Sequence, residues 1–179
     1  MTISLRHVEL YALTREAGLP LGVTGKTALL NLLNAEAVTG VTLSASNVTL
    51  TPKVVSDQPN FNSLVEVKGS PALGYTGAFS VYYNRVGLSQ AFVGKDTKTL
   101  PVLTGSIHQS LAAINSAFGL QLETIDVVDK PLTAADYQVV LTASETSCLY
   151  TPGSAITLGS PRTMQGNFTS FDLDGFDPA

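Results

Sequence analysis

Few side chains in this sequence are of the types that act as nucleophiles, general bases or metal ligands. The chain has two histidines, His7 and His108, and a single cysteine, Cys148. Neither histidine has a carboxylate at metal-ligand spacing, and one cysteine excludes a cysteine-based zinc site and an internal disulfide. Cys148 alternates with apolar neighbours in TSCLY, which is typical of a small core residue. We therefore predict no catalytic residue, no metal ion and no cofactor.

Aspartates in the second half of the chain form a candidate acidic site. Asp126 and Asp129 lie in TIDVVDKP, and Asp136 follows them. Two nearby carboxylates suit cation binding or acid–base catalysis. Aspartates around a proline turn also accept hydrogen bonds from backbone N–H groups, as turn and cap residues do. Their position around Pro131 favours this second, structural role.

The segment Gly22–Thr27 has the Gly-Lys-Thr ending of a phosphate-binding loop. Such a loop needs a further glycine five positions before the second one, so that successive backbone N–H groups can wrap the phosphate. Here that position holds Pro20, and no apolar strand precedes it. The segment therefore predicts a capped helix start and not a nucleotide site.

The elements that would position these residues alternate between helical and extended patterns. Apolar spacing predicts helices over 4–17, about 27–37 and 105–118, the last ended by Gly119. Their N-caps are expected at Ser4, at Thr24 or Thr27, and at Thr104. The turn-rich segment 41–55 and the alternating segment 64–68 follow the second helix and read as strands.

The clearest strand pattern is AFSVYYNRV, in which Phe79, Val81 and Tyr83 share one face. Three more strands are expected in 136–144, 146–152 and 154–160, separated by turn residues. Strands joined by short turns pair in antiparallel fashion, so we predict an α+β fold with a mainly antiparallel sheet or sandwich and two or three packed helices.

Two parts of the sequence resemble each other. Each has a predicted helix with an asparagine near its end, Asn34 or Asn115, followed by an apolar pair and a later valine, Val48 or Val127. Asparagine at a helix end supplies side-chain hydrogen bonds and tolerates the left-handed conformation. The similarity fits either an old duplication or two independent uses of one helix-to-strand corner.

The composition excludes several classes of protein. Of 179 residues 44% are hydrophobic and 13% are charged, while 16 serines and 20 threonines supply much of the polarity. Ten basic residues are too few for a nucleic-acid-binding face, and no apolar run fits a membrane span. We expect a folded, weakly charged domain in a reducing compartment. Two explanations fit this balance. Either partners cover the surface, because interface cores are depleted in charged residues, or the protein is a monomer with a threonine-rich β surface.

The last residues differ from the rest, because Phe168, Phe171 and Phe176 alternate with Asp172, Asp174 and Asp177. The aspartates have the spacing of a calcium loop but lack its closing glutamate. Exposed phenylalanines cost free energy, so this arm should dock on its own domain or on a neighbouring subunit. The expected organisation is an N-terminal helix or arm over 1–20, a core domain over 21–163 and a docking arm over 164–179.

Four motifs resemble one known group. They are the Gly-Tyr-Thr-Gly turn at 74–77, Val-Tyr-Tyr-Asn-Arg at 81–85, the helix end at 114–120 and the corner at 124–127. Together they resemble small, often paralogous virion structural proteins of large, contractile-tailed bacteriophages, over roughly residues 24–160. The resemblance implies a structural role in assembly, a place in the virion and synthesis in the host bacterial cytoplasm.

Charge, arm and resemblance together predict a non-enzymatic, multicopy structural subunit that binds capsid or tail proteins and itself, in a decoration, cement, collar or tail-accessory role. It would bind no nucleic acid, membrane or small-molecule substrate.

Arg85 would anchor a carboxylate, either Asp126 or a neighbour's tail aspartate, or else be solvated at a strand end. The alternative is a glycan- or receptor-binding β module of a phage adhesion apparatus using Tyr75, Tyr82 and Tyr83. The expected assembly residues are Leu5, Val8, Tyr11, Arg85, Phe168, Phe171, Asp172, Asp174 and Phe176.

Overall fold

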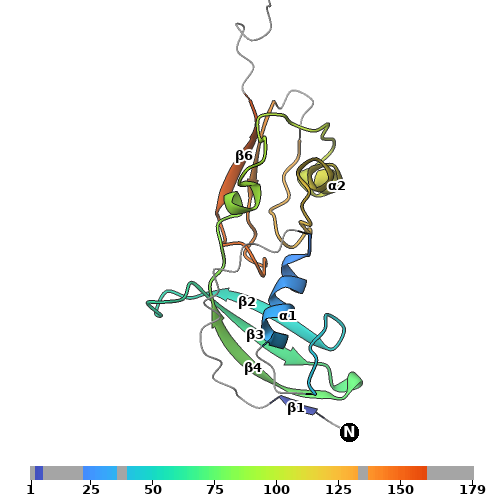
Figure 1. Ribbon diagram of the computed structural model, residues 1–179, viewed down its shortest axis with the longest axis vertical. Helices are drawn as coiled ribbons and strands as arrows, with labels where there is room; N and C mark the ends of the chain where they lie inside the picture. Colours follow the sequence, from blue (N-terminus) through green and yellow to red (C-terminus); the bar gives the residue numbers. More distant parts are fainter. Residues whose placement is uncertain (1–2, 6–21, 36–39, 133–136, 161–179) are drawn as a thin grey trace, which may run out of the picture.

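The chain forms two α+β halves that follow one another along the long axis of the molecule (Figure 1). The computed structural model describes residues 3–5, 22–35, 40–132 and 137–160. Each half packs one α-helix on a sheet in which most strand pairs are antiparallel, so the expected α+β fold with mainly antiparallel pairing is confirmed.

The first half is a four-stranded sheet with the spatial order β1-β4-β3-β2, and α1 lies against it. Pairing is antiparallel between β2, β3 and β4, whereas β1 runs parallel to the start of β4. Its elements are β1 (Ile3–Leu5), α1 (Gly25–Ala35), β2 (Val48–Val54), β3 (Ser63–Gly69), the 3-10 turn η1 (Pro71–Leu73) and β4 (Tyr75–Tyr83).

The second half has a smaller sheet of two strands, extended by an antiparallel bridge between Val127 and Ala143. Its elements are the 3-10 helix η2 (Leu88–Phe92), α2 (Ile107–Phe118), β5 (Gln138–Thr142) and β6 (Ala155–Gly159). The long loops around α2 are tied together by backbone hydrogen bonds, such as the one from Ile107 N to Lys130 O.

Each half has its own hydrophobic cluster, built around its helix. Leu29, Leu30 and Leu33 of α1 pack against the inner face of the first sheet, where the alternation of Phe79, Val81 and Tyr83 is buried as expected. Ile107, Leu111, Ile114 and Phe118 of α2 pack with Val139, Leu141 and Leu158 of the second sheet.

The helix-end asparagines make the same pair of hydrogen bonds in both halves. Asn34 accepts from Leu43 N at 2.7 Å and donates to Leu43 O at 2.8 Å. Asn115 accepts from Leu122 N and donates to Leu122 O, both at 2.9 Å. One side-chain amide therefore replaces a backbone partner at each corner where the chain leaves the helix.

The equivalence continues into the next turn. Ser44 N donates to the side chain of Asn47 at 2.7 Å, and Glu123 N donates to the side chain of Asp126 at 3.0 Å. Asparagine and aspartate form such turns with the same geometry, because both place an oxygen acceptor at the same distance from the backbone.

The chain just after β3 and just after β5 is held to this turn in the same way. Ser70 N donates to Asn47 O and Ser144 N donates to Asp126 O, both at 2.9 Å. The similarity thus covers a helix, a corner, a turn and a strand pairing, which is more than two chance uses of one corner would share. We infer that the halves are two copies of one structural unit.

Several local predictions differ from the structure. The cap of α2 is Ser106, whose hydroxyl accepts from Gln109 N, and not Thr104. Of the two caps expected for α1, Thr24 is the one whose hydroxyl accepts from Thr27 N. Segment 146–152 is not a strand: only Tyr150 forms a bridge, to Val86, because the hydroxyl of Ser147 holds this segment in a turn.

The helix expected over 4–17 is wrong at its start, where Ser4 and Leu5 belong to strand β1. Pairing with the edge of β4 supplies backbone hydrogen bonds that override the local helical pattern. Val8, Tyr11 and the rest of that segment lie outside the described residues. The division into 1–20, 21–163 and 164–179 stays a prediction, since most of the first segment and all of the last lie outside the described residues as well.

Candidate functional site

Arg85 lies where the two halves meet, and its side chain is 3% exposed. Nε donates to the hydroxyl of Ser63 at 2.7 Å, and Nη1 donates to Glu145 O at 3.1 Å and to Ser147 O at 2.9 Å. No carboxylate pairs with the guanidinium among the described residues. Two of the three expectations for this residue, a solvated arginine and a direct ion pair with Asp126, are therefore wrong, whereas pairing with a neighbour's tail aspartate stays a prediction. A serine hydroxyl and two backbone carbonyls accept from Nε and Nη1, while the buried Nη2 has no hydrogen-bond partner among the described residues.

Asp126 is connected to Arg85 through Ser147. The hydroxyl of Ser147 donates to Oδ1 of Asp126 at 2.7 Å, while the carbonyl of the same serine accepts from Arg85. Asp126 is 1% exposed, and its burial raises the pKa of the carboxyl group despite the hydrogen bonds from Glu123 N and Ser147. The acidic-site interpretation of Asp126 thus gives way to the turn role that the sequence favoured.

The remaining polar residues of this junction are also buried. The hydroxyl of Tyr83 donates to Cys148 O at 3.0 Å, which joins β4 to the second half. Burial raises the pKa of the Tyr83 hydroxyl, and burial beside Asp126 raises the pKa of the Cys148 thiol to about 11. A thiol with this pKa stays protonated at neutral pH, as expected for a core cysteine. We call Tyr83, Arg85, Asp126, Ser147 and Cys148 the junction cluster.

The two other candidate sites also have structural roles. His108 contacts Val127 O through Nε2 at 2.8 Å, and its backbone N donates to Asp129 Oδ1 at 2.9 Å. Hydrogen bonds from His108 N and from the Ser106 side chain lower the pKa of Asp129. In the former phosphate-loop candidate, Gly25 begins α1 and packs so closely on the second half that a Cβ there would lie 3.1 Å from Asp126 Oδ1.

The outward faces of the two sheets differ in charge. On the first sheet Lys53 and Glu66 form an ion pair at 3.5 Å, and Lys68 adds a further charge. The equivalent face of the second sheet has no charged residue in β5 or β6, and Val140 is 44% exposed at its centre. We call this surface the uncharged face; it comprises Gln138, Val140, Thr142, Ala155 and Thr157.

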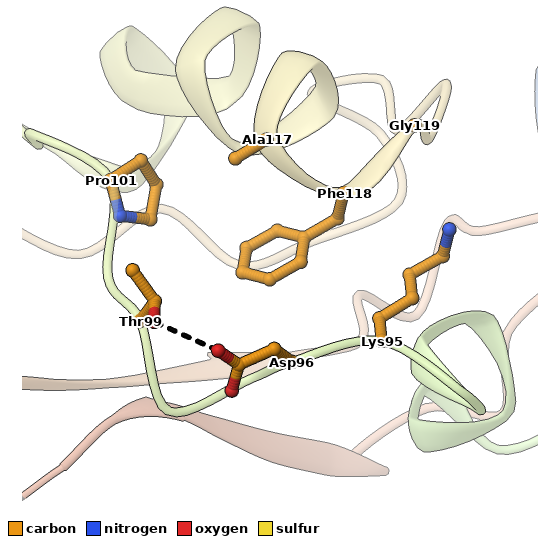
Figure 2. A pocket seen from close by; sticks show the side chains of 7 residues that line it. All are labelled: Lys95, Asp96, Thr99, Pro101, Ala117, Phe118 and Gly119. Atoms are coloured by element: carbon orange, nitrogen blue, oxygen red, sulfur yellow. Dashed lines mark hydrogen bonds between the residues drawn. The ribbon is translucent and has the colours of Figure 1, made fainter.

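A pocket of about 560 Å³ opens beside the C-terminal end of α2 (Figure 2). The ring of Phe118 forms its apolar wall and packs edge-on against Phe92 at 5.2 Å. Asp96, on the opposite wall, accepts hydrogen bonds from Thr99 Oγ1 and Lys98 N, which lower the pKa of its carboxyl group. Further lining residues are Lys95, Pro101, Ala117 and Gly119.

Within the described residues, no three His, Cys, Asp or Glu side chains come close enough together to bind a metal ion. In the same part of the chain, no helix has the length and hydropathy of a membrane span.

Only one of the assembly residues expected from the sequence has a described side chain. That residue is Arg85, which faces its own chain, and Leu5 is described only as part of β1. The arm residues Phe168, Phe171, Asp172, Asp174 and Phe176 lie outside the described residues. Sequence reasoning missed the uncharged face, although a signal was present: the segment 137–160 contains a single charged residue, Glu145.

Comparison with known proteins identifies a family but no function. A family model matches residues 19–177, which is most of the chain. The chain therefore belongs to a family of unknown function, DUF7941. Neither a curated protein nor a solved structure matches it.

Proposed function

We propose that this member of a family without known function is a non-enzymatic structural subunit of a tailed-phage virion, present in many copies and bound to neighbouring capsid or tail subunits. The motifs at 74–77, 81–85, 114–120 and 124–127 motivate the phage context through their resemblance to virion structural proteins. The observation that carries the structural role is the uncharged face.

The two copies of the unit provide an internal comparison for this surface. Both sheets bury one face against a helix, and both leave the other face outward. The first copy keeps Lys53, Glu66 and Lys68 there, as expected of a solvated surface, whereas the second has only threonine, valine, alanine and glutamine. Burial of charge is costly, so interface cores lose charged residues. The difference supports binding of a protein partner on the second copy.

The virion assignment is tested by mass spectrometry of purified particles of the phage that encodes the chain. The protein should remain with the particles through density-gradient purification and occur at many copies relative to the portal protein. Its absence from purified particles would overturn the virion assignment.

The surface itself is tested by a charge placed at its centre. Val140→Lys should reduce incorporation into particles by about ten-fold, because a buried unpaired ammonium costs more than 1.4 kcal/mol at an interface. Thr51→Lys, on the exposed face of the first sheet, is the matched control and should incorporate normally. Equal incorporation of both variants would show that the uncharged face is not an interface.

The three tyrosines of the glycan-binding alternative do not lie together on one face of β4. Tyr83 is buried and donates to Cys148 O, and the Tyr75 hydroxyl donates to Thr42 O at 3.1 Å. Tyr82 lies on the opposite face of β4 and packs on Phe61 at 6.0 Å. Because side chains alternate along a strand, no single face of β4 presents all three tyrosines, and this favours the structural role over glycan binding.

A further inference from the structure

The pocket beside α2 combines an apolar wall with one lysine and one aspartate, Asp96, whose carboxylate is already hydrogen-bonded within its own loop. Phe118 provides the wall, and Lys95 lies at the rim near Gly119, where a Cβ would be 3.8 Å from its Nζ (Figure 2). Lys95 has no ion-pair partner among the described residues. The pocket therefore suits a ligand that presents both an apolar ring and a carboxylate.

The chain around the pocket leaves apolar surface exposed. Val93 precedes the lining segment and is 69% exposed, and Val102 follows it and is 87% exposed. Single exposed valines are common on protein surfaces. Neither valine lines the pocket, but both flank the lining segment in sequence and are available to a segment that covers it.

The last described residues of the chain lie against the same segment. Gly159 N, at the end of β6, donates to Thr97 O at 2.7 Å. The hydroxyl of Ser160 donates to Lys98 O at 3.5 Å. The chain that follows β6 therefore starts beside the loop that lines the pocket.

The segment that follows has the complementary composition. Residues 164–179 contain Phe168, Phe171 and Phe176 together with three aspartates, and no basic residue. Phe168 is eight residues beyond Ser160, so an extended chain reaches at most about 26 to 29 Å. This span is long enough to return to a pocket whose lining loop contacts Ser160 itself.

We propose that the pocket formed by Lys95, Asp96, Thr99, Pro101 and Phe118 is the docking site of the C-terminal arm, residues 164–179, of the same chain. A phenylalanine of the arm enters the pocket, and neighbouring aspartates pair with Lys95 and Lys98. The short tether favours binding within one chain, because it gives the arm an effective concentration in the millimolar range. This contact does not depend on the virion assignment.

Disulfide trapping in the full-length chain tests the proposal. Thr99→Cys at the pocket is combined with Ser170→Cys in the arm, and a second variant uses Gly175→Cys in place of Ser170→Cys to allow for the register of the arm. The native Cys148 does not interfere, since it is buried and burial raises its pKa to about 11. Thr49→Cys, exposed on β2 of the first half, replaces Thr99→Cys in the control pair.

At least one pocket pair should form an intramolecular disulfide under mild oxidation about ten-fold faster than its control. Adding Lys95→Glu and Lys98→Glu to that pair should slow disulfide formation several-fold at low salt. Non-reducing electrophoresis separates the monomeric product from a cross-linked dimer. Equal rates in all pocket and control pairs would overturn the docking site. A product that is mainly dimeric would overturn docking within one chain and assign the arm to a second copy.

Discussion

Replacement of Asn115 by alanine should strongly destabilise the protein. The substitution removes two hydrogen bonds of 2.9 Å to the backbone of Leu122, a residue that is 5% exposed. A buried backbone group left without a partner costs about 1–3 kcal/mol, and partial access of water reduces the sum for two such groups. We therefore expect Asn115→Ala to lower the free energy of unfolding by about 2–4 kcal/mol.

The second copy of the corner provides a parallel test. Asn34→Ala removes hydrogen bonds of 2.7 and 2.8 Å to Leu43, which is also 5% exposed, so its effect should agree with that of Asn115→Ala to within about 1 kcal/mol. Asn31→Ala is the control, because Asn31 is an exposed residue of α1 and its replacement brings the same gain in helix propensity. It should change stability by less than about 0.5 kcal/mol.

Urea denaturation followed by far-ultraviolet circular dichroism measures these differences. With a slope of about 2 kcal/mol/M, the two corner variants should unfold at urea concentrations about 1–2 M below the wild type, without a change of slope. If both variants unfold within experimental error of Asn31→Ala, the corner hydrogen bonds contribute nothing net. If only one is destabilised, the two corners are not energetically equivalent and the argument from duplication fails.

Three further substitutions or reactions test other parts of the structure. Burial raises the pKa of the Asp126 carboxyl group above its value in the unfolded chain, so the wild type loses stability as the pH rises from about 4. Asparagine does not ionise, so the free energy of unfolding of Asp126→Asn relative to the wild type should increase between pH 4 and 7 in urea titrations. A difference that does not change with pH would contradict this. Cys148 should react with a chromogenic disulfide reagent at pH 8 only after denaturant is added, and rapid labelling of the native protein would show that the thiol is accessible. Gly69→Ala should cost about 1–3 kcal/mol, because its Cβ would lie 2.9 Å from the backbone of Tyr75. Gly87→Ala, with its nearest contact at 3.6 Å, should unfold like the wild type, and equal midpoints for both glycine variants would refute the steric argument.

Local patterns in the sequence predict a large part of the fold. The alternation of Phe79, Val81 and Tyr83 predicts both β4 and its buried face, because side chains alternate across a strand whatever its partners are. Gly119, with φ of 60°, ends α2 as expected, since glycine enters the left-handed region without a steric penalty. The spacing of Asn34 and Asn115 also reveals the repeated corner, although it does not show how far the repeat extends.

Predictions fail where a distant part of the chain decides the local structure. Leu5 belongs to a strand because the edge of β4 is available to it, and segment 146–152 is held in turns by the Ser147 hydroxyl. The sequence places Arg85 at a charged strand end, yet three acceptors from two other segments surround its guanidinium. Sequence spacing cannot show such contacts, because their partners lie 22 to 62 residues away.

The sequence by itself determined the α+β class, the mainly antiparallel pairing and the core position of Cys148, since these follow from periodicity. For Asp126 it favoured the turn role, because of the neighbouring proline, and left the acidic site open. The tertiary structure decided which surfaces remain outward. It shows that the two copies of one unit bury the same kind of face and differ in charge on the other, and that β6 ends beside the pocket at Phe118. Exposure depends on what the folded chain places against each residue, so these candidate binding surfaces become visible only once the two halves are packed.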